Sequence, residues 1–213
     1  MAQAVEVAGA SKTLGGVSVL SEIDLTVSAG EVIGLAGVNG SGKTMLLRLI
    51  AGLIKPDEGT VHVCERNLAR GWSDLPPSIG MLIESPSFVP YLTGLSNLWG
   101  LASIRAEVSR DDVMDGIRNV GLDPLDKRPF KKYSLGMRQR LGIACAMMEN
   151  PDVILLDEPT NALDSEGVSL LSGLIREQSR RGAAIIMACH DAEFLSAHSH
   201  RVMTMANGRW CHE

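Results

Sequence analysis

The chain has 213 residues, of which 45% are hydrophobic and 21% charged, a composition typical of one globular domain with a buried core. Its formal net charge of −5 argues against a general electrostatic attraction to nucleic acid. Apolar runs stay below the roughly eighteen residues of a membrane-spanning helix, and Met1–Ala10 lacks the features of a secretory signal. We therefore expect a globular protein of the cytoplasm that does not cross a membrane by itself.

The cysteines and histidines show no metal-ligand spacing. The cysteines are scattered, at Cys64, Cys145, Cys189 and Cys211. Without a C-x-x-C pair they indicate reduced thiols in a reducing compartment, not a disulfide framework or a zinc site. His198 and His200 alternate as in a strand or loop, and we interpret them as an ordinary polar edge.

The first third of the chain predicts strands around one short helix. Strands are expected where apolar residues alternate or run together, at Val5–Ala8, Ile23–Val27, Glu31–Ala36, Thr60–Val63 and Ile79–Ile83. Lys43–Ala51 has helical periodicity, and Gly52 stands where a helix would stop.

The middle is helical, and the last third alternates strands with helices. Helices are predicted at Leu92–Ala106, Asp111–Val120, Leu135–Glu149 and Ser165–Arg180, and strands at Val153–Leu156 and Ala184–Ala188. Asn207-Gly208 favours a type I′ turn between strands Arg201–Ala206 and Arg209–His212. Apolar strands alternating with helices predict a parallel sheet covered on both faces, into which the helical middle is inserted.

The segment Gly37–Thr44, GVNGSGKT, matches the phosphate-loop pattern G-x-x-x-x-G-K-[ST]. Glycines let the backbone approach a phosphate, and successive N–H groups at a helix start form an anion nest. Lys43 is expected to reach the β- and γ-phosphates and Thr44 to bind Mg²⁺. The expected nucleotide contacts are Gly37, Asn39, Gly40, Ser41, Gly42, Lys43, Thr44 and Met45. The strand before the loop and the helix after it argue against a chance glycine-rich turn.

Two acids follow the apolar strand Val153–Leu156. We expect Asp157 to hold Mg²⁺ through water and Glu158 to orient or deprotonate the attacking water. Alone, the pair could simply cap the next helix; with the phosphate loop it indicates nucleoside triphosphate hydrolysis. Asp164–Gly167 fits the D-x-x-G pattern of GTPases, but no Asn-Lys-x-Asp segment exists to recognise guanine, so GTP is disfavoured.

Two further segments, Tyr133–Arg140 (YSLGMRQR) and Asn150–Asp164 (NPDVILLDEPTNALD), resemble the ATP-binding-cassette (ABC) family, and motif order agrees over essentially the whole chain. The resemblance implies ATP and Mg²⁺ as ligands. It also implies an α/β fold: a P-loop NTPase (RecA-like) core, a small antiparallel β subdomain and an inserted α-helical subdomain at approximately residues 86–150. The whole, residues 1–213, would be a single nucleotide-binding domain.

The resemblance assigns roles across a dimer. Ser134–Gln139 resembles the signature motif, which closes on the γ-phosphate held by the other protomer and implies contacts from Ser134, Gly136 and Gln139. The dipole of the helix that follows gives a physical reason for this contact. Asn161–Asp164 resembles the D-loop that links the two sites.

The residue that follows the apolar strand Ala184–Ala188 by two positions, His190, resembles the switch histidine that contacts the γ-phosphate. With Lys43 and Glu158 it completes the expected catalytic set.

Two departures from the family pattern matter. Leu14 stands where an aromatic residue often stacks on adenine, so the base would lack a strong π contact. Glu84 stands where Gln is usual as a metal-facing residue. We predict that like charges hold Glu84 away until Mg-ATP binds, so that it acts as a sensor; the alternative is a solvated surface residue. Glu84 and the Ser-Leu-Gly-Met signature resemble bacterial cassettes that export, or confer immunity to, lantibiotics, bacteriocins and related antibiotics.

The expected function is that of an ATPase subunit of an ABC transporter, peripheral on the inner face of the cell membrane. Its partners would be a second nucleotide-binding subunit, in a homodimer or heterodimer, and a separate transmembrane permease, with no nucleic acid. Ser85–Thr93 exposes apolar residues that either pack in the core or contact the permease. The alternatives are a soluble ABC ATPase acting on nucleic acid or ribosomes, and a non-hydrolysing regulatory module.

Overall fold

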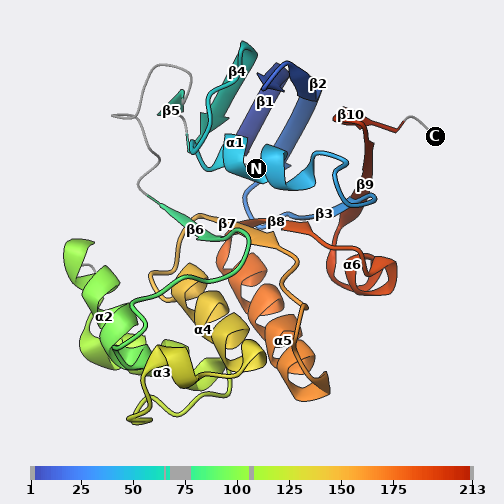
Figure 1. Ribbon diagram of the computed structural model, residues 1–213. Coiled ribbons are helices and arrows are strands. Elements are labelled where there is room, and N and C mark those ends of the chain that lie inside the picture. Colours follow the sequence, from blue (N-terminus) through green and yellow to red (C-terminus); the bar gives the residue numbers. More distant parts are fainter. Residues whose placement is uncertain (1–2, 65, 68–77, 106–107, 212–213) are drawn as a thin grey trace.

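The computed structural model describes residues 3–64, 66–67, 78–105 and 108–211. They form an α/β fold in which one helix lies between two sheets and the remaining helices cover the far face of the larger sheet (Figure 1). No helix in these ranges is both long and apolar enough to cross a membrane.

The larger sheet has six strands in the order β10-β9-β3-β8-β7-β6. Its strands are β3 (Val32–Ala36), β6 (Ile79–Leu82), β7 (Val153–Asp157), β8 (Ala184–Ala188), β9 (Arg201–Ala206) and β10 (Arg209–Trp210). All neighbours are parallel except β9 and β10. The carboxyl ends of β3, β7 and β8 therefore share one edge, where parallel sheets place their ligands.

Alternate residues of the central strands belong to two separate cores. In β7, Val153 and Leu155 pack with α1 (Lys43–Ile50) and the smaller sheet. Ile154 and Leu156 pack with the helices on the opposite face. Burial on both faces explains why the strand is a continuous apolar run, as the sequence predicts.

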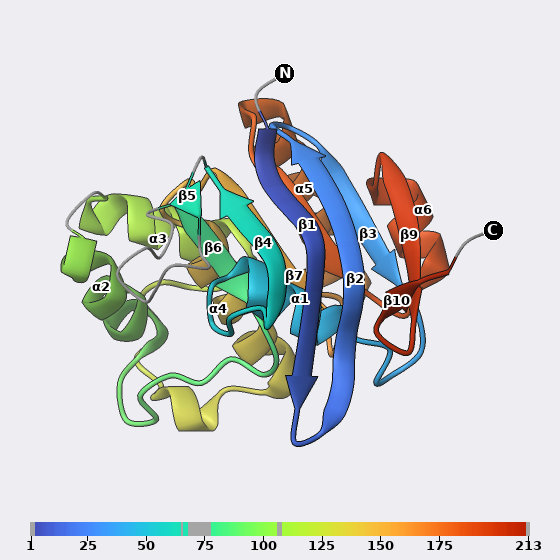
Figure 2. The same cartoon turned by 90° about the horizontal axis from the view of Figure 1, so that it is seen from above.

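The smaller sheet is antiparallel, in the order β2-β1-β4-β5. Its strands are β1 (Gln3–Leu14), β2 (Val17–Ser28), β4 (Glu58–Val63) and β5 (Arg66–Asn67). Seen from above, its first three strands lie over α1 (Figure 2). The long β1–β2 hairpin extends well beyond the two short strands that alternation predicts.

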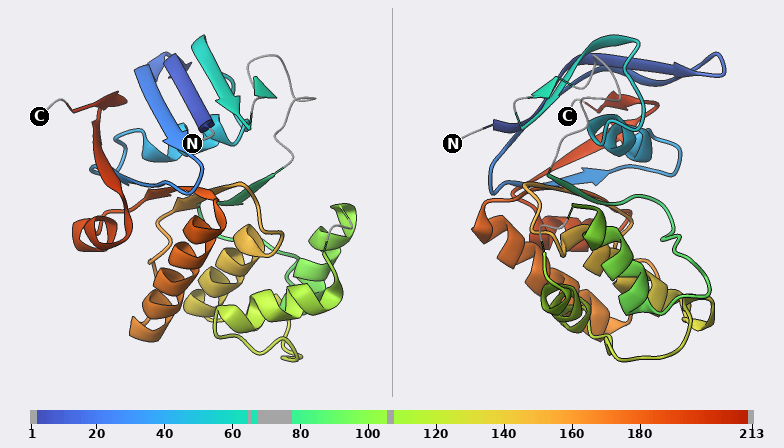
Figure 3. Two further views of the ribbon diagram at one scale, coloured as in Figure 1. Left: turned by 180° about the vertical axis from the view of Figure 1, so that it is seen from behind. Right: turned by 90° about the vertical axis from the view of Figure 1, so that its left-hand side faces the viewer.

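The helices between β6 and β7 are α2 (Gly94–Arg105), α3 (Arg110–Asn119), the 3₁₀ turn η3 (Phe130–Lys132) and α4 (Leu135–Met147). They lie with α5 (Ser165–Arg181) on the face away from the antiparallel sheet (Figure 3). Side chains cap these helices: Ser134 accepts from Met137 N at α4, and Asp164 accepts from Gly167 N at α5. This cap, with no guanine-recognition segment in the sequence, explains the D-x-x-G match at Asp164.

The terminal hairpin is confirmed, since Asn207 and Gly208 have φ of 50° and 74°, as a type I′ turn requires. Ala106 and His212, the predicted ends of a helix and a strand, lie outside the described residues. One helix was missed: α6 (Ala192–His198), capped by Asp191. The predicted strand or loop at His198 is therefore wrong. His198 Nδ1 bonds Phe194 O at 2.9 Å, and His200 Nδ1 accepts from Val32 N.

Candidate nucleotide-binding and catalytic site

The phosphate loop joins β3 to α1, and close backbone packing requires two of its glycines, Gly37 and Gly42. A Cβ at Gly37 would lie 2.3 Å from Met205 O. Gly42 is the N-cap of α1, with φ of 112° and no side-chain cap. The first N–H groups of α1 therefore have no intrahelical acceptor and point to the space before the helix. The segment forms the anion nest that the sequence predicts.

Two polar side chains of this loop, Ser41 and Lys43, are buried. Ser41 is 2% exposed, and its Oγ has no hydrogen-bond partner among the described residues. Lys43 is 6% exposed, and its Nζ donates to Gly37 O at 2.6 Å and Val38 O at 3.1 Å. An ammonium group satisfied by neutral carbonyls can exchange them for phosphate oxygens, which bind it more strongly. The loop thus fits an anionic ligand.

The predicted metal residues meet across two elements. Thr44 Oγ1, on α1, donates to Asp157 Oδ2, at the end of β7, at 2.8 Å. Burial raises the pKa of the Asp157 carboxyl; the Thr44 bond lowers it, and the nearby Glu158 charge adds to the rise. Hydroxyl and carboxylate oxygens are the hard donors that Mg²⁺ prefers. The pair fits Mg²⁺, whose charge would relieve that of the buried carboxylate.

Glu158 directly follows and adopts φ of 48°, which is uncommon for a non-glycine residue. This bend turns its carboxylate toward His190, whose Nδ1 lies 2.7 Å from Oε2 and whose backbone N–H donates to the same oxygen at 3.3 Å. A strained backbone held at a carboxylate is typical of functional sites. Two of the three predicted catalytic side chains, Glu158 and His190, are therefore in direct contact.

The backbone of Glu84 lies beside Asp157, whereas its side chain pairs with a residue outside the metal site. Its backbone amide lowers the pKa of the Asp157 carboxyl. Its own carboxylate, 60% exposed, forms an ion pair of 2.5 Å with Arg48 Nη2 on α1. The predicted metal contact of Glu84 requires this ion pair to open and stays a prediction.

Two exposed apolar side chains lie at the tip of the β1–β2 hairpin, where the sequence predicts contact with adenine. Leu14 and Val17 are paired in register and are 41% and 64% exposed. Val19, two residues along β2, lies against the loop, because a Cβ on Gly42 would be 3.0 Å from Val19 O. The hairpin tip at Val17 is therefore about 7 Å along the strand from the residue that contacts the loop. The contact of Leu14 with adenine stays a prediction.

The signature segment packs against the D-loop of its own chain. Ser134 is exposed at the start of α4 and lines a cavity of about 360 Å³ with Gly136, Ala162 and Asp164. A Cβ on Gly136 would lie 2.8 Å from Ala162 O, so a side chain there would push the two segments apart.

Gln139 is buried, and its amide donates to the carbonyls of Glu158 and Pro159 at 3.1 and 3.2 Å. The structure gives it an internal positioning role. Its predicted contact with nucleotide stays a prediction, as do those of Asn39, Gly40 and Met45.

Sequence reasoning missed Arg140, which lies in the quoted motif but received no role. Its guanidinium donates from Nη1 to Val120 O at 3.0 Å and from Nη2 to Asp164 Oδ1 at 2.6 Å. The side chain is 11% exposed. A Cβ on Gly121 would lie 2.3 Å from Nη1, so this glycine leaves room for the guanidinium. Arg140 joins α3, α4 and the D-loop.

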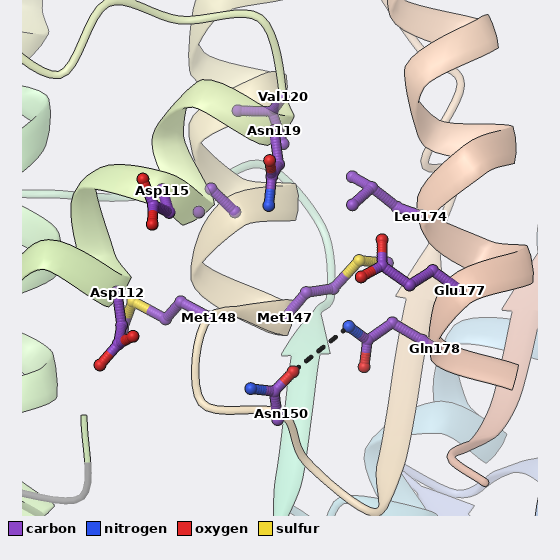
Figure 4. Close-up of a pocket in the computed structure, with 12 residues that line it drawn as sticks. Asp112, Asp115, Asn119, Val120, Met147, Met148, Asn150, Leu174, Glu177 and Gln178 are labelled. Carbon is purple, nitrogen blue, oxygen red and sulfur yellow. Dashed lines mark hydrogen bonds between the residues drawn. The ribbon is translucent and has the colours of Figure 1, made fainter. Parts of the chain in front are cut away.

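A separate cavity of about 200 Å³ lies between α3, α4 and α5 (Figure 4). It is lined by acids and amides, including Asp112, Asp115 and Glu177, around Met147 and Met148. The methionines stand at the end of α4 opposite the signature, about 18 Å away along the helix axis. Its acidic lining and distance do not suit a nucleotide.

Comparison with known proteins agrees with this site. Residues 20–161 match the family described as ABC transporter. An uncharacterized ABC transporter ATP-binding protein of Bacillus subtilis, YybJ, is 40% identical over 205 residues, or 96% of this chain and 94% of the relative. The bacitracin transport ATP-binding protein BcrA of Enterococcus faecalis is 37% identical over 89% of this chain and 62% of its own length.

A solved ATP-binding subunit of an ABC transporter superposes with a TM-score of 0.88 at 26% identity, covering 97% of this chain and 88% of that one. The fold class predicted from the sequence is confirmed.

Proposed function

The chain belongs to the ABC transporter family as an ATP-binding and ATP-hydrolysing subunit, and we propose that it drives a separate permease through ATP-dependent closure of two such subunits. The observation that carries the proposal is the joint placement of phosphate loop, Asp157 and the Glu158–His190 pair at one sheet edge. Those residues come from α1, the end of β7 and the segment after β8, which the parallel register of the sheet brings to one edge.

Hydrolysis follows from these positions. The Glu158 carboxylate accepts a proton from water as the water oxygen attacks the γ-phosphorus, and the bond from that phosphorus to the β–γ bridging oxygen breaks. Lys43 and the N–H groups of α1 hold the phosphates. His190, whose Nδ1 lies 2.7 Å from Glu158 Oε2, would contact the γ-phosphate. A Mg²⁺ ion at Thr44 and Asp157 would supply positive charge to the phosphate oxygens.

The signature segment supports pairing with a second subunit. Ser134 and Leu135 begin α4, and Leu135 is 68% exposed, an apolar side chain that a partner would cover. The helix start presents its positive end outward, where the γ-phosphate held by another protomer would be stabilised. We propose a head-to-tail dimer, formed with an identical or a related subunit.

A groove between the sheet and α2 supports contact with a permease. It encloses about 390 Å³ and is lined by apolar residues such as Leu53, Met81 and Leu101 together with the Arg48–Glu84 pair. In the segment Ser85–Thr93, some apolar residues pack in the core and others are exposed, so both predicted roles have candidates.

Phe88 packs on the core and stacks edge-on with Phe130 at 5.2 Å. Val89, Tyr91 and Leu92 are exposed. A permease helix with an apolar face fits this groove.

For the cargo, we propose a peptide or antibiotic that is exported. The support is the Glu84 and Ser-Leu-Gly-Met pattern together with the 37% identity to a bacitracin transport protein. Because the chain spans 62% of that relative's length, the proposal for the cargo is based only on the part of the relative that this chain matches. The alternative, an ABC ATPase acting on nucleic acid or ribosomes, is disfavoured by the net charge of −5.

The test combines turnover with dimerisation. Lys43→Ala should lower ATPase activity by about two orders of magnitude or more, because the positioned cation of the nest is lost. Glu158→Gln should hydrolyse slowly and form a dimer with Mg-ATP on size-exclusion chromatography. Near-normal turnover in Lys43→Ala would contradict the site, and a monomeric Glu158→Gln protein would contradict the dimer.

Permease contact is tested separately. Leu101→Glu should uncouple transport in cells while the purified subunit keeps its ATPase activity and melting temperature. Substitution of Ile104, which is 79% exposed on the same helix outside the groove, is the matched control. Normal transport by Leu101→Glu would exclude the groove as the contact.

A further inference from the structure

A thiol lies beside the catalytic carboxylate. Cys189 follows β8 and is 0% exposed. The β7–β8 register pairs Asp157 with Ala188, so the next residues, Glu158 and Cys189, also become neighbours. Ligand atoms from Glu158, Cys189 and His190 all lie within 4.8 Å of one another. Hydrolysis as proposed uses two of these residues and leaves the thiol without a role.

The donor set determines which ions it suits. Thiolate, imidazole and carboxylate are the ligands of Zn²⁺ and related transition metals, whereas Mg²⁺ prefers oxygen. Bond lengths of about 2.0–2.3 Å in a tetrahedral zinc site place the donors about 3.5 Å apart. Small side-chain shifts reach this spacing from a group already within 4.8 Å. The His190 side chain is 65% exposed, which gives an ion a path and leaves room for a fourth, water ligand.

We propose that Glu158, Cys189 and His190 form a three-ligand site for a divalent transition metal of the zinc class, and that the bound ion inhibits ATP hydrolysis. The Cys189 thiol loses its proton to solvent. Nδ1 of the imidazole binds the metal in place of its contact with Glu158, and the ring proton resides on Nε2. One proton is released for each ion bound.

Groups around the sulfur can stabilise a thiolate. The backbone N–H of Asp191 donates to Cys189 Sγ at 3.4 Å, and Thr160 Oγ1 lies at the same distance. Burial raises the pKa of the Cys189 thiol, and these two contacts oppose the rise. Metal binding completes the removal of the proton.

Inhibition follows from the identity of the ligands. A carboxylate bound to the metal is no longer a base for the attacking water, and the imidazole bound through Nδ1 no longer supports that carboxylate. The phosphate loop is untouched, so ATP binding persists while kcat falls.

The inhibition measurement rests on the proposed ATPase function. Turnover is measured at fixed Mg-ATP against rising Zn²⁺ in wild type, Cys189→Ala and Cys145→Ala. Cys145 is the matched control, because burial raises the pKa of its thiol to about 11 and it lies in the permease groove. Loss of one ligand should raise the half-inhibiting Zn²⁺ concentration about tenfold or more in Cys189→Ala. Without Zn²⁺, both variants should turn over ATP as wild type does, and Cys145→Ala should keep the wild-type half-inhibiting Zn²⁺ concentration. Equal inhibition of all three proteins overturns the proposal.

A second measurement does not depend on turnover. Titration of the nucleotide-free protein with Co²⁺ should give a thiolate-to-cobalt absorption band that saturates at one equivalent. The band should be lost in Cys189→Ser and kept in Cys145→Ser. A wild-type protein without the band overturns the proposal. An inactive wild-type protein that shows the band leaves the metal site standing and refutes only the ATPase function.

Discussion

Arg140→Ala removes the guanidinium that connects α3, α4 and the D-loop. Nη1 holds Val120 O at 3.0 Å, and Nη2 holds Asp164 Oδ1 at 2.6 Å with Glu166 Oε2 at 3.4 Å. We expect the variant to be less stable and slower in hydrolysis, because the D-loop loses its fixed distance from the signature helix.

The expected loss of stability is about 2–4 kcal/mol. An unpaired buried carbonyl at Val120 costs about 1–3 kcal/mol, and the lost apolar stem of Arg140 adds about 1 kcal/mol. The acids add little, since Asp164 and Glu166 side chains are 67% and 75% exposed and regain water when the cation leaves. Because both acids regain water, the expected range lies about 1 kcal/mol under the roughly 3–5 kcal/mol of a fully buried broken pair.

Urea unfolding and ATPase kinetics measure the two effects. Arg138→Ala, on the same helix, is the matched control: Arg138 is half-buried, donates to Lys131 O at 3.1 Å and lies over the Phe130 ring at 5.2 Å, so its loss should cost about 1–2 kcal/mol. The stability of Arg140→Lys should lie between those of wild type and Arg140→Ala, since one ammonium group cannot donate to both acceptors as the guanidinium does. A loss for Arg140→Ala no greater than that for Arg138→Ala would refute the reasoning, as would unchanged kcat.

Two other residues of the site give further predictions. Asp157→Asn should abolish turnover yet raise the melting temperature of the nucleotide-free protein at pH 7. The pKa of Asp157 is raised by burial, so its ionised form costs stability above the folded-state pKa, and the gain should vanish as the pH falls to about 4; a lower melting temperature at pH 7 would disprove it. Arg48→Gln should free Glu84 and lower the Mg²⁺ concentration for half-maximal turnover, whereas Glu84→Gln should raise it while ATP binding persists. Unchanged Mg²⁺ dependence in both variants would identify Glu84 as a solvated surface residue.

The sequence by itself determined the phosphate loop and the acids at the end of β7. Gly37–Thr44 is a contiguous strand–loop–helix element whose glycine positions and lysine are fixed by local backbone geometry. Asp157 and Glu158 follow a continuous run of apolar residues, which is typical of a strand buried on both faces of a sheet. Such signals lie within a few residues of one another, so periodicity and motif spacing are enough to detect them.

Only the tertiary structure decided which side chains meet. Glu84 lies 36 positions from Arg48, and no local pattern shows that their charges pair. Cys189 is a scattered cysteine in the sequence, but the parallel register of β7 and β8 brings it beside Glu158. Sheet order and helix packing set these contacts, and they depend on the whole core. The sequence therefore identified the chemistry of the site, whereas the fold selected the partners of each side chain.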